Sequence, residues 1–296
     1  MKIGGLYLQL LLAGVILICC LTLMQALAVQ VVGPLLGVSV DRTAMMLADF
    51  TFHNEQEIIA FKCILATVQA GSFGLATLIL VSIYKERKEW LGISKPISMQ
   101  VALLVILTLF ASLPLIQFTT FNAETFHLPE TFKHWELTFK DAEAKTEVML
   151  KTILKYDLIL NILVVALFPA VMEELFFRGY IQQLFRQHYS ATVSVICTGL
   201  IFSLAHFQVY GLIPRMLLGM GLGLLLEWSG SIWLSILAHF VNNATSVLIA
   251  WFVLQNKLPE KYMDNSFEAH WIITILSGVF IVLGLALIKK RIQHSN

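Results

Sequence analysis

The sequence predicts an all-α fold, a polytopic transmembrane helix bundle with about eight spans. Two observations predict this class. Hydrophobic residues make up 58% of the 296 residues and charged residues only 13%, a composition well outside that of soluble domains. Eight apolar segments also approach or exceed the about 20 residues that a helix, rising about 1.5 Å per residue, needs to cross a bilayer. We therefore expect an integral, multi-pass membrane protein that contacts membrane lipid.

The apolar segments follow one another without a Gly/Ser-rich or Pro-rich linker, which favours a single membrane domain. The first segment is longer than the core of a signal peptide, about 7 to 15 residues, and is expected to be a retained span. The expected spans cover 5–33, 58–84, 98–119, 153–187, 191–208, 212–228, 231–254 and 270–288.

The short loops differ in their content of lysine and arginine, which predicts the orientation of the spans. The loop "YKERKEWLGISK" and the tail "KKRIQHSN" are basic, whereas 34–57 contains only Arg42. With eight spans, both termini are then cytoplasmic and the segment 120–150 faces outward. That segment mixes both charge signs with aromatic residues, so we expect a solvated or interfacial helix, with substrate docking as the alternative.

Other features of the sequence have ordinary interpretations. The net charge of +1 and the scattered basic residues exclude nucleic acid as an expected partner. The four cysteines lie in apolar runs without CxxC spacing and are expected to be packing residues. The run "GMGLG" at 219–223 contains GxxxG, which is typical of close packing between membrane helices.

Three polar clusters interrupt the apolar segments and are the candidate functional residues. An ionisable residue at the centre of a membrane helix costs about 2.5 to 3.5 kcal/mol on insertion scales, so such residues usually mark a site. His206 and His239 are both expected inside apolar helices. Each cluster alone is more typical of a structural role, and the occurrence of all three in separate helices favours a site. The clusters comprise Glu173, Glu174 and Arg178 in "VMEELFFRGY", Phe202 and His206 in "FSLAH", and His239 and Asn243 in "SILAHFVNN".

Helical spacing assigns these residues to faces. Glu174 and Arg178 are four residues apart and are expected to form an ion pair, whereas Glu173 points about 100° away from them. By the same spacing, the side chains of His239 and Asn243 converge on one face. Phe202 and His206 also share a face.

Counting residues from the expected turns predicts the depth of each cluster. If the fourth and fifth spans turn near Ser190, Glu173 and His206 both lie about 25 Å from that turn and can face each other. His239 reaches this level if the hairpin of the fourth and fifth spans projects further into the cytoplasm than the hairpin of the sixth and seventh spans, which turns at Gly230. The clusters then surround one point within the bilayer, nearer its cytoplasmic side.

Such a constellation fits hydrolysis. A carboxylate in an apolar site can act as a general base, a histidine can hold water or a metal, and an asparagine can donate to an oxyanion. Two histidines and a carboxylate are also a known ligand set for catalytic zinc. The sequence lacks the HExxH pattern that would indicate zinc directly.

The segments "EELFFR", "FSLAH" and "HFVNN" resemble, in this order, the EExxxR, FxxxH and HxxxN motifs of the CPBP family. These intramembrane proteases, also called the Abi family, are related to the type II CAAX prenyl endopeptidases and bacteriocin-processing enzymes. The resemblance covers about 155–250. It implies an all-helical membrane fold with a catalytic chamber open to the cytoplasmic leaflet, in a bacterial inner or cell membrane.

The resemblance also implies a role for each motif residue. Glu173 and His206 would activate water, and His239 and Asn243 would stabilise the oxyanion. Glu174, Arg178 and Phe202 would be supporting residues. A divalent metal ion such as zinc, held by Glu173, His206 and His239, and metal-free activation of water both remain open.

The predicted organisation has three parts. The N-terminal transmembrane helices cover 1–150, a catalytic core covers 151–255, and a last helix with a basic tail covers 256–296. The leading hypothesis is an endopeptidase that cleaves a peptide or membrane-protein substrate within or near the bilayer. The alternatives are a non-proteolytic bacteriocin self-immunity or scaffold protein and a secondary transporter, the latter disfavoured because no inverted repeat is evident.

Overall fold

The computed structural model describes residues 3–83, 91–124, 131, 138, 140, 144, 158–208, 211–262 and 270–295. Throughout these residues all regular secondary structure is helical, which confirms the predicted all-α class. The predicted outward-facing segment 120–150 lies almost entirely outside the described residues beyond the end of α6, and so does most of the basic loop at 84–95.

Several of the long helices are α-helices interrupted by π-helical turns, labelled η. The first contains α1 (Ile3–Leu27), η1 (Ala28–Val32) and α2 (Gly33–Leu35), and α3 (Val40–Asp49) follows it. The second contains α4 (Glu55–Gln69), η2 (Ala70–Leu75) and α5 (Ala76–Ile83), and α6 (Met99–Glu124) comes next. The third contains α8 (Leu158–Asn161), η5 (Ile162–Leu167), α9 (Phe168–Phe176), η6 (Phe177–Gln182) and α10 (Gln183–Arg186). The remaining elements are α11 (Ala191–Leu204), α12 (Leu212–Ser229), α13 (Ile232–Leu254), the 3-10 turn η7 (Glu260–Tyr262) and α14 (Trp271–Ser295).

Seven helices in the described part of the chain are long and apolar enough to cross a membrane, and they match seven of the eight predicted segments. The segment predicted at 191–208 is instead the 14-residue helix α11, about 21 Å long. Its helix ends early because the backbone turns at Phe207, which has a left-handed φ of 53°. His206 consequently lies in the turn after α11. The sequence had predicted a position inside a helix.

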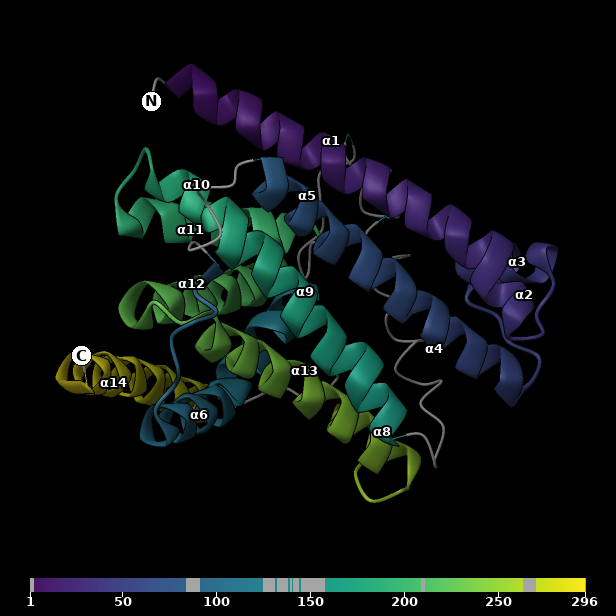
Figure 1. The fold of residues 1–296 in the computed structure, drawn as a ribbon. Helices are drawn as coiled ribbons and strands as arrows, with labels where there is room; N and C mark the ends of the chain where they lie inside the picture. The colour runs from purple at the N-terminus through teal and green to yellow at the C-terminus, as the bar shows by residue number, and fades with distance from the viewer. Residues whose placement is uncertain are drawn as a thin grey trace.

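The helix that contains α8, α9 and α10 is central to the bundle. In Figure 1 it runs between the helix of α4 and α5 on one side and α13 on the other, and α9 contacts α4, η2 and α13. On the far side of α13 and α12, α6 and α14 pack against each other. The N-terminal helices therefore lie directly against the helix that carries the EExxxR motif.

The hairpin of α11 and α12 is closely packed, as the GxxxG pattern predicted. A Cβ atom on Gly219 would come within 3.1 Å of the Cα atom of Gly199, so only glycines permit this backbone approach. On the same helix, a Cβ atom on Gly223 would come within 2.7 Å of the side-chain oxygen of Gln182. The carbonyl groups of α12 are thus accessible to side chains of the central helix.

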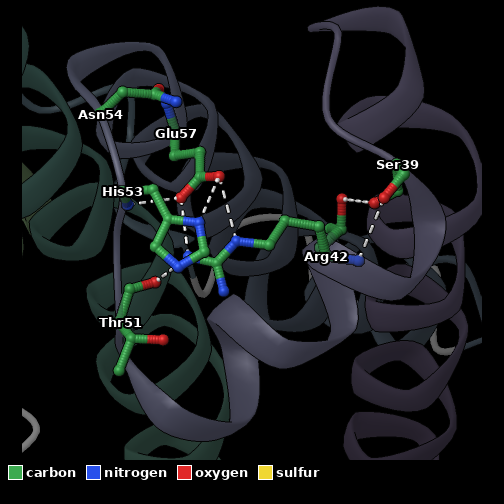
Figure 2. A network of polar contacts seen from close by, with 7 residues as sticks. Ser39, Arg42, Thr51, His53, Asn54 and Glu57 are labelled. Carbon is green, nitrogen blue, oxygen red and sulfur yellow. Dashed lines mark hydrogen bonds and ion pairs between the residues drawn. The ribbon is translucent and has the colours of Figure 1, made fainter.

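A polar network at the opposite end of α4 from Gln69 joins α3 to the start of α4 (Figure 2). Arg42 donates two hydrogen bonds to the Glu57 carboxylate, at 3.0 and 2.7 Å, and one to the carbonyl oxygen of Thr51 at 2.8 Å. Glu57 Oε2 also accepts from the backbone N–H of His53 at 2.8 Å, and Asn54 caps α4 by accepting from the N–H of Glu57. This network stabilises the connection between the first two spans.

Candidate active site

The carboxyl group of Glu173 lies in the middle of the central helix. This helix extends over 29 residues from Leu158 to Arg186, so Glu173 is about 20 Å from either end. The residue is only 5% exposed. A carboxyl group held at this depth is the feature that most needs an explanation, because burial of such a group is costly without a partner.

Two side chains approach the carboxyl group of Glu173, one from α4 and one from the turn after α11. Gln69, the last residue of α4, donates a hydrogen bond from Nε2 to Glu173 Oε1 at 3.3 Å. His206 Nε2 lies 3.8 Å from Glu173 Oε2. The structure therefore brings Glu173 and His206 to one level, as counting residues from Ser190 predicted.

The hydrogen bond of the other ring nitrogen determines the tautomer of neutral His206. His206 Nδ1 lies 2.8 Å from the carbonyl oxygen of Phe202. A carbonyl oxygen only accepts, so Nδ1 carries the hydrogen and Nε2 presents its lone pair towards Glu173. This is the arrangement that a water molecule could bridge, since it is too long for a direct hydrogen bond.

Glu174 belongs to a second, fully buried cluster. Its Oε1 atom lies 3.0 Å from Arg178 Nη1 and 2.8 Å from His239 Nδ1. Arg178 donates a further hydrogen bond to the carbonyl oxygen of Gly219 at 3.1 Å. The predicted ion pair of Glu174 and Arg178 is present, and His239 joins it, which helical spacing alone did not indicate.

Phe202 lies at the centre of both clusters. Its ring is stacked under the guanidinium group of Arg178, with 4.4 Å between Cζ and the ring centroid, a cation–π geometry. The imidazoles of His206 and His239 pack against the same ring, at centroid distances of 4.9 and 5.6 Å. Phe202 therefore fixes the positions of three of the polar groups at once.

Asn243 lies one helical turn beyond His239 on α13. Its Oδ1 atom accepts a hydrogen bond at 3.2 Å from Nδ2 of the neighbouring Asn242. Both amides are only half-buried. The oxyanion role that the motif implies for Asn243 stays a prediction.

The residues proposed as metal ligands do not form a ligand set as they are placed. The described residues contain no group of three or more His, Cys, Asp or Glu side chains that could hold a metal ion. Glu173 faces His206, whereas Nδ1 of His239 is turned to Glu174. As they are placed, Glu173, His206 and His239 therefore do not converge on one point where a metal ion could bind.

Sequence reasoning missed Gln69 and Gln182. Gln182 follows Arg178 by one turn, is buried, and donates to the carbonyl oxygen of Gly223 and to Glu227 Oε1, both at 3.1 Å. Both glutamines are polar residues within predicted spans, and that was the only signal that could have revealed them. Gln69 is also 104 residues away from Glu173 in the chain.

Comparison with known proteins agrees with the motifs. Residues 155–245 match a family model described as type II CAAX prenyl endopeptidase Rce1-like. The matched range contains all three motifs and confirms the family resemblance that they predicted. No significant match was found among curated proteins or among solved structures.

Proposed function

We propose that this chain, whose residues 155–245 match the Rce1-like type II CAAX prenyl endopeptidases, is an intramembrane endopeptidase that uses Glu173 and His206 to activate water. One observation carries the proposal. Oε2 of Glu173, midway along the central helix, lies 3.8 Å from Nε2 of His206 and is buried without a hydrogen-bond partner among the described residues. The family match supports peptidase activity in general, and the geometry supports these two residues as its centre.

In the proposed reaction a water molecule contacts both Glu173 Oε2 and His206 Nε2. Glu173 takes one proton from this water while the oxygen of the water attacks the carbonyl carbon of the peptide bond. The carbonyl oxygen becomes the oxyanion of a tetrahedral intermediate. Glu173 then returns the proton to the nitrogen as the C–N bond breaks, which leaves a carboxylic acid and an amine and restores the enzyme.

His206 orients the water in this scheme, because its Nε2 lone pair accepts the second hydrogen of the water. Its ring is held in this tautomer by the carbonyl oxygen of Phe202. Fixed donors and acceptors of this kind reduce the reorganisation that the transition state requires. His206 and Glu173 are thus proposed to act as one unit.

His239 and Asn243 are proposed to face the developing oxyanion, the role implied by the HxxxN motif. His239 already donates from Nδ1 to Glu174. Donation to an oxyanion from Nε2 therefore requires hydrogens on both ring nitrogens. Glu174 and Arg178 hold His239 and Phe202 in place and do not contact the substrate in this proposal.

The test uses purified protein in liposomes with a farnesylated, internally quenched peptide that ends in a CAAX sequence. Glu173→Gln is expected to abolish cleavage while the amount and thermal stability of the folded protein persist. In cells, the same variant should capture membrane-associated substrates that mass spectrometry can identify. A Glu173→Gln protein that cleaves at the wild-type rate would refute the proposal. If this variant and His206→Ala protect cells against a bacteriocin as well as the wild-type protein does, the immunity or scaffold alternative is favoured.

A further inference from the structure

We infer that Gln69, in the N-terminal helices outside the family-matched segment, is a positioning residue for Glu173 and for the water that it activates. This inference rests on the proposed function. It assigns part of the active site to α4, a helix that no motif indicates. The inference depends on three observations: a contact, two buried atoms that lack partners, and the shape of the backbone around Gln69.

The contact fixes one half of the Glu173 carboxyl group. Gln69 Nε2 donates to Oε1 at 3.3 Å, while Oε2 faces His206 at 3.8 Å. With Oε1 engaged, rotation of the carboxyl group is restricted, so that Oε2 remains towards the imidazole. Gln69 thereby selects the oxygen that is available as the base.

Two oxygen atoms at this point are buried without a hydrogen-bond partner among the described residues. They are Oε1 of Gln69 and Oε2 of Glu173. A buried acceptor without a donor is costly, so such atoms usually have a water or ligand as partner. The water proposed to attack the substrate satisfies Oε2 of Glu173 by donating one hydrogen to it and the other to Nε2 of His206, and a second water that donates to Oε1 of Gln69 satisfies the remaining acceptor.

The backbone around Gln69 is shaped for this contact. The π-helical turn η2 begins immediately after Gln69, and π-helical turns occur frequently at functional sites. Within η2, a Cβ atom on Gly74 would come within 2.8 Å of the sulfur of Met172, the residue before Glu173. Glycine at position 74 therefore allows η2 to approach α9 closely enough for Gln69 to reach Glu173.

The experiment compares Gln69→Leu with a matched control on the same helix, Gln56→Leu. Gln56 also donates one hydrogen bond from its side-chain amide, to the carbonyl oxygen of Leu36. It lies about 20 Å from Gln69 along α4. In the liposome assay, Gln69→Leu should lower kcat about 10- to 100-fold, as expected when a catalytic group is misplaced, with KM unchanged. Gln56→Leu should leave both constants unchanged.

Gln69→Glu gives a second readout that a merely structural role would not produce. A protonated glutamic acid at this position can donate to Glu173 and accept from water as glutamine does, whereas the ionised form repels Glu173. The activity of Gln69→Glu relative to wild type should therefore rise as the pH falls. If the ratio of Gln69→Glu activity to wild-type activity does not change with pH, the inference is contradicted.

A spectroscopic measurement keeps this inference separable from the proposed function. The infrared band of the Glu173 side chain is assigned by its loss in Glu173→Gln. This band should shift in Gln69→Leu and remain in place in Gln56→Leu. An unshifted band, or wild-type kcat in Gln69→Leu beside an inactive Glu173→Gln, overturns the role of Gln69 alone. An active Glu173→Gln overturns the proposed function. In that case the infrared band of Glu173 alone tests the contact between Gln69 and Glu173.

Discussion

Replacement of Arg178 by methionine is expected to destabilise the protein strongly. The guanidinium group is fully buried and makes an ion pair with Glu174, a hydrogen bond to the carbonyl oxygen of Gly219, and a cation–π contact with Phe202. Methionine retains part of the side-chain volume but none of these contacts. The carboxylate of Glu174 would then be buried with His239 as its remaining partner.

Removing one partner of a buried ion pair costs about 3 to 5 kcal/mol, because the other charge stays buried without compensation. The hydrogen bond from His239 offsets part of this cost, so we expect a value near the lower end, about 3 kcal/mol. Neutralising both partners in Glu174→Gln/Arg178→Met should recover part of the loss. The double variant is therefore expected to be more stable than Arg178→Met alone.

The assay is reversible unfolding in mixed detergent micelles, followed by the loss of helix signal. Arg186→Met is the matched control on the same helix, since Arg186 pairs with Glu227 at 3.1 Å but its side chain is 38% exposed. Exposed pairs contribute at most about 1 kcal/mol. Equal free energies of unfolding for Arg178→Met and Arg186→Met would refute the reasoning.

Three further predictions concern other parts of the molecule. Phe202→Ala should lower the free energy of unfolding by about 3 to 5 kcal/mol and reduce kcat, since the ring supports both histidines; unchanged turnover in the liposome assay would contradict this. Arg42→Met should lower the free energy of unfolding in the same assay, because the hydrogen bonds to Glu57 and to Thr51 are lost. It should leave kcat unchanged, because Glu57 in the network of Figure 2 lies about 18 Å along α4 from Gln69. Because α11 and α12 form a hairpin that returns the chain to the side from which it enters, reporter domains fused to either terminus should still both be cytoplasmic, and opposite locations would disprove the predicted orientation.

The sequence predicted those parts of the site that depend on local geometry. Helical spacing is independent of tertiary structure, so the ion pair of Glu174 and Arg178 could be predicted directly. The common level of Glu173 and His206 followed from the position of a turn. That turn was correctly placed because Ser190 caps α11, its Oγ accepting from the N–H of Val193.

The remaining parts depend on how the helices rotate and where they end. The contact between His239 and Glu174 requires a particular rotation of α13 against α9, which no spacing within one helix determines. The early end of α11 depends on the left-handed backbone at Phe207, although the sequence remains largely apolar to this point. Gln69 lies too far from the motifs in the chain for any local pattern to associate it with them.

The short length of α11 relates the protein to the thickness of its bilayer. A helix of about 21 Å does not cross a hydrocarbon core of about 30 Å. A bilayer adapts to short hydrophobic segments by thinning around them. The closed end of the α11 and α12 hairpin carries His206, so local thinning would bring the aqueous phase nearer to the residue proposed to orient the water. The acyl-chain length of the surrounding lipids would then affect how readily water reaches the centre of the protein, where the proposed reaction takes place.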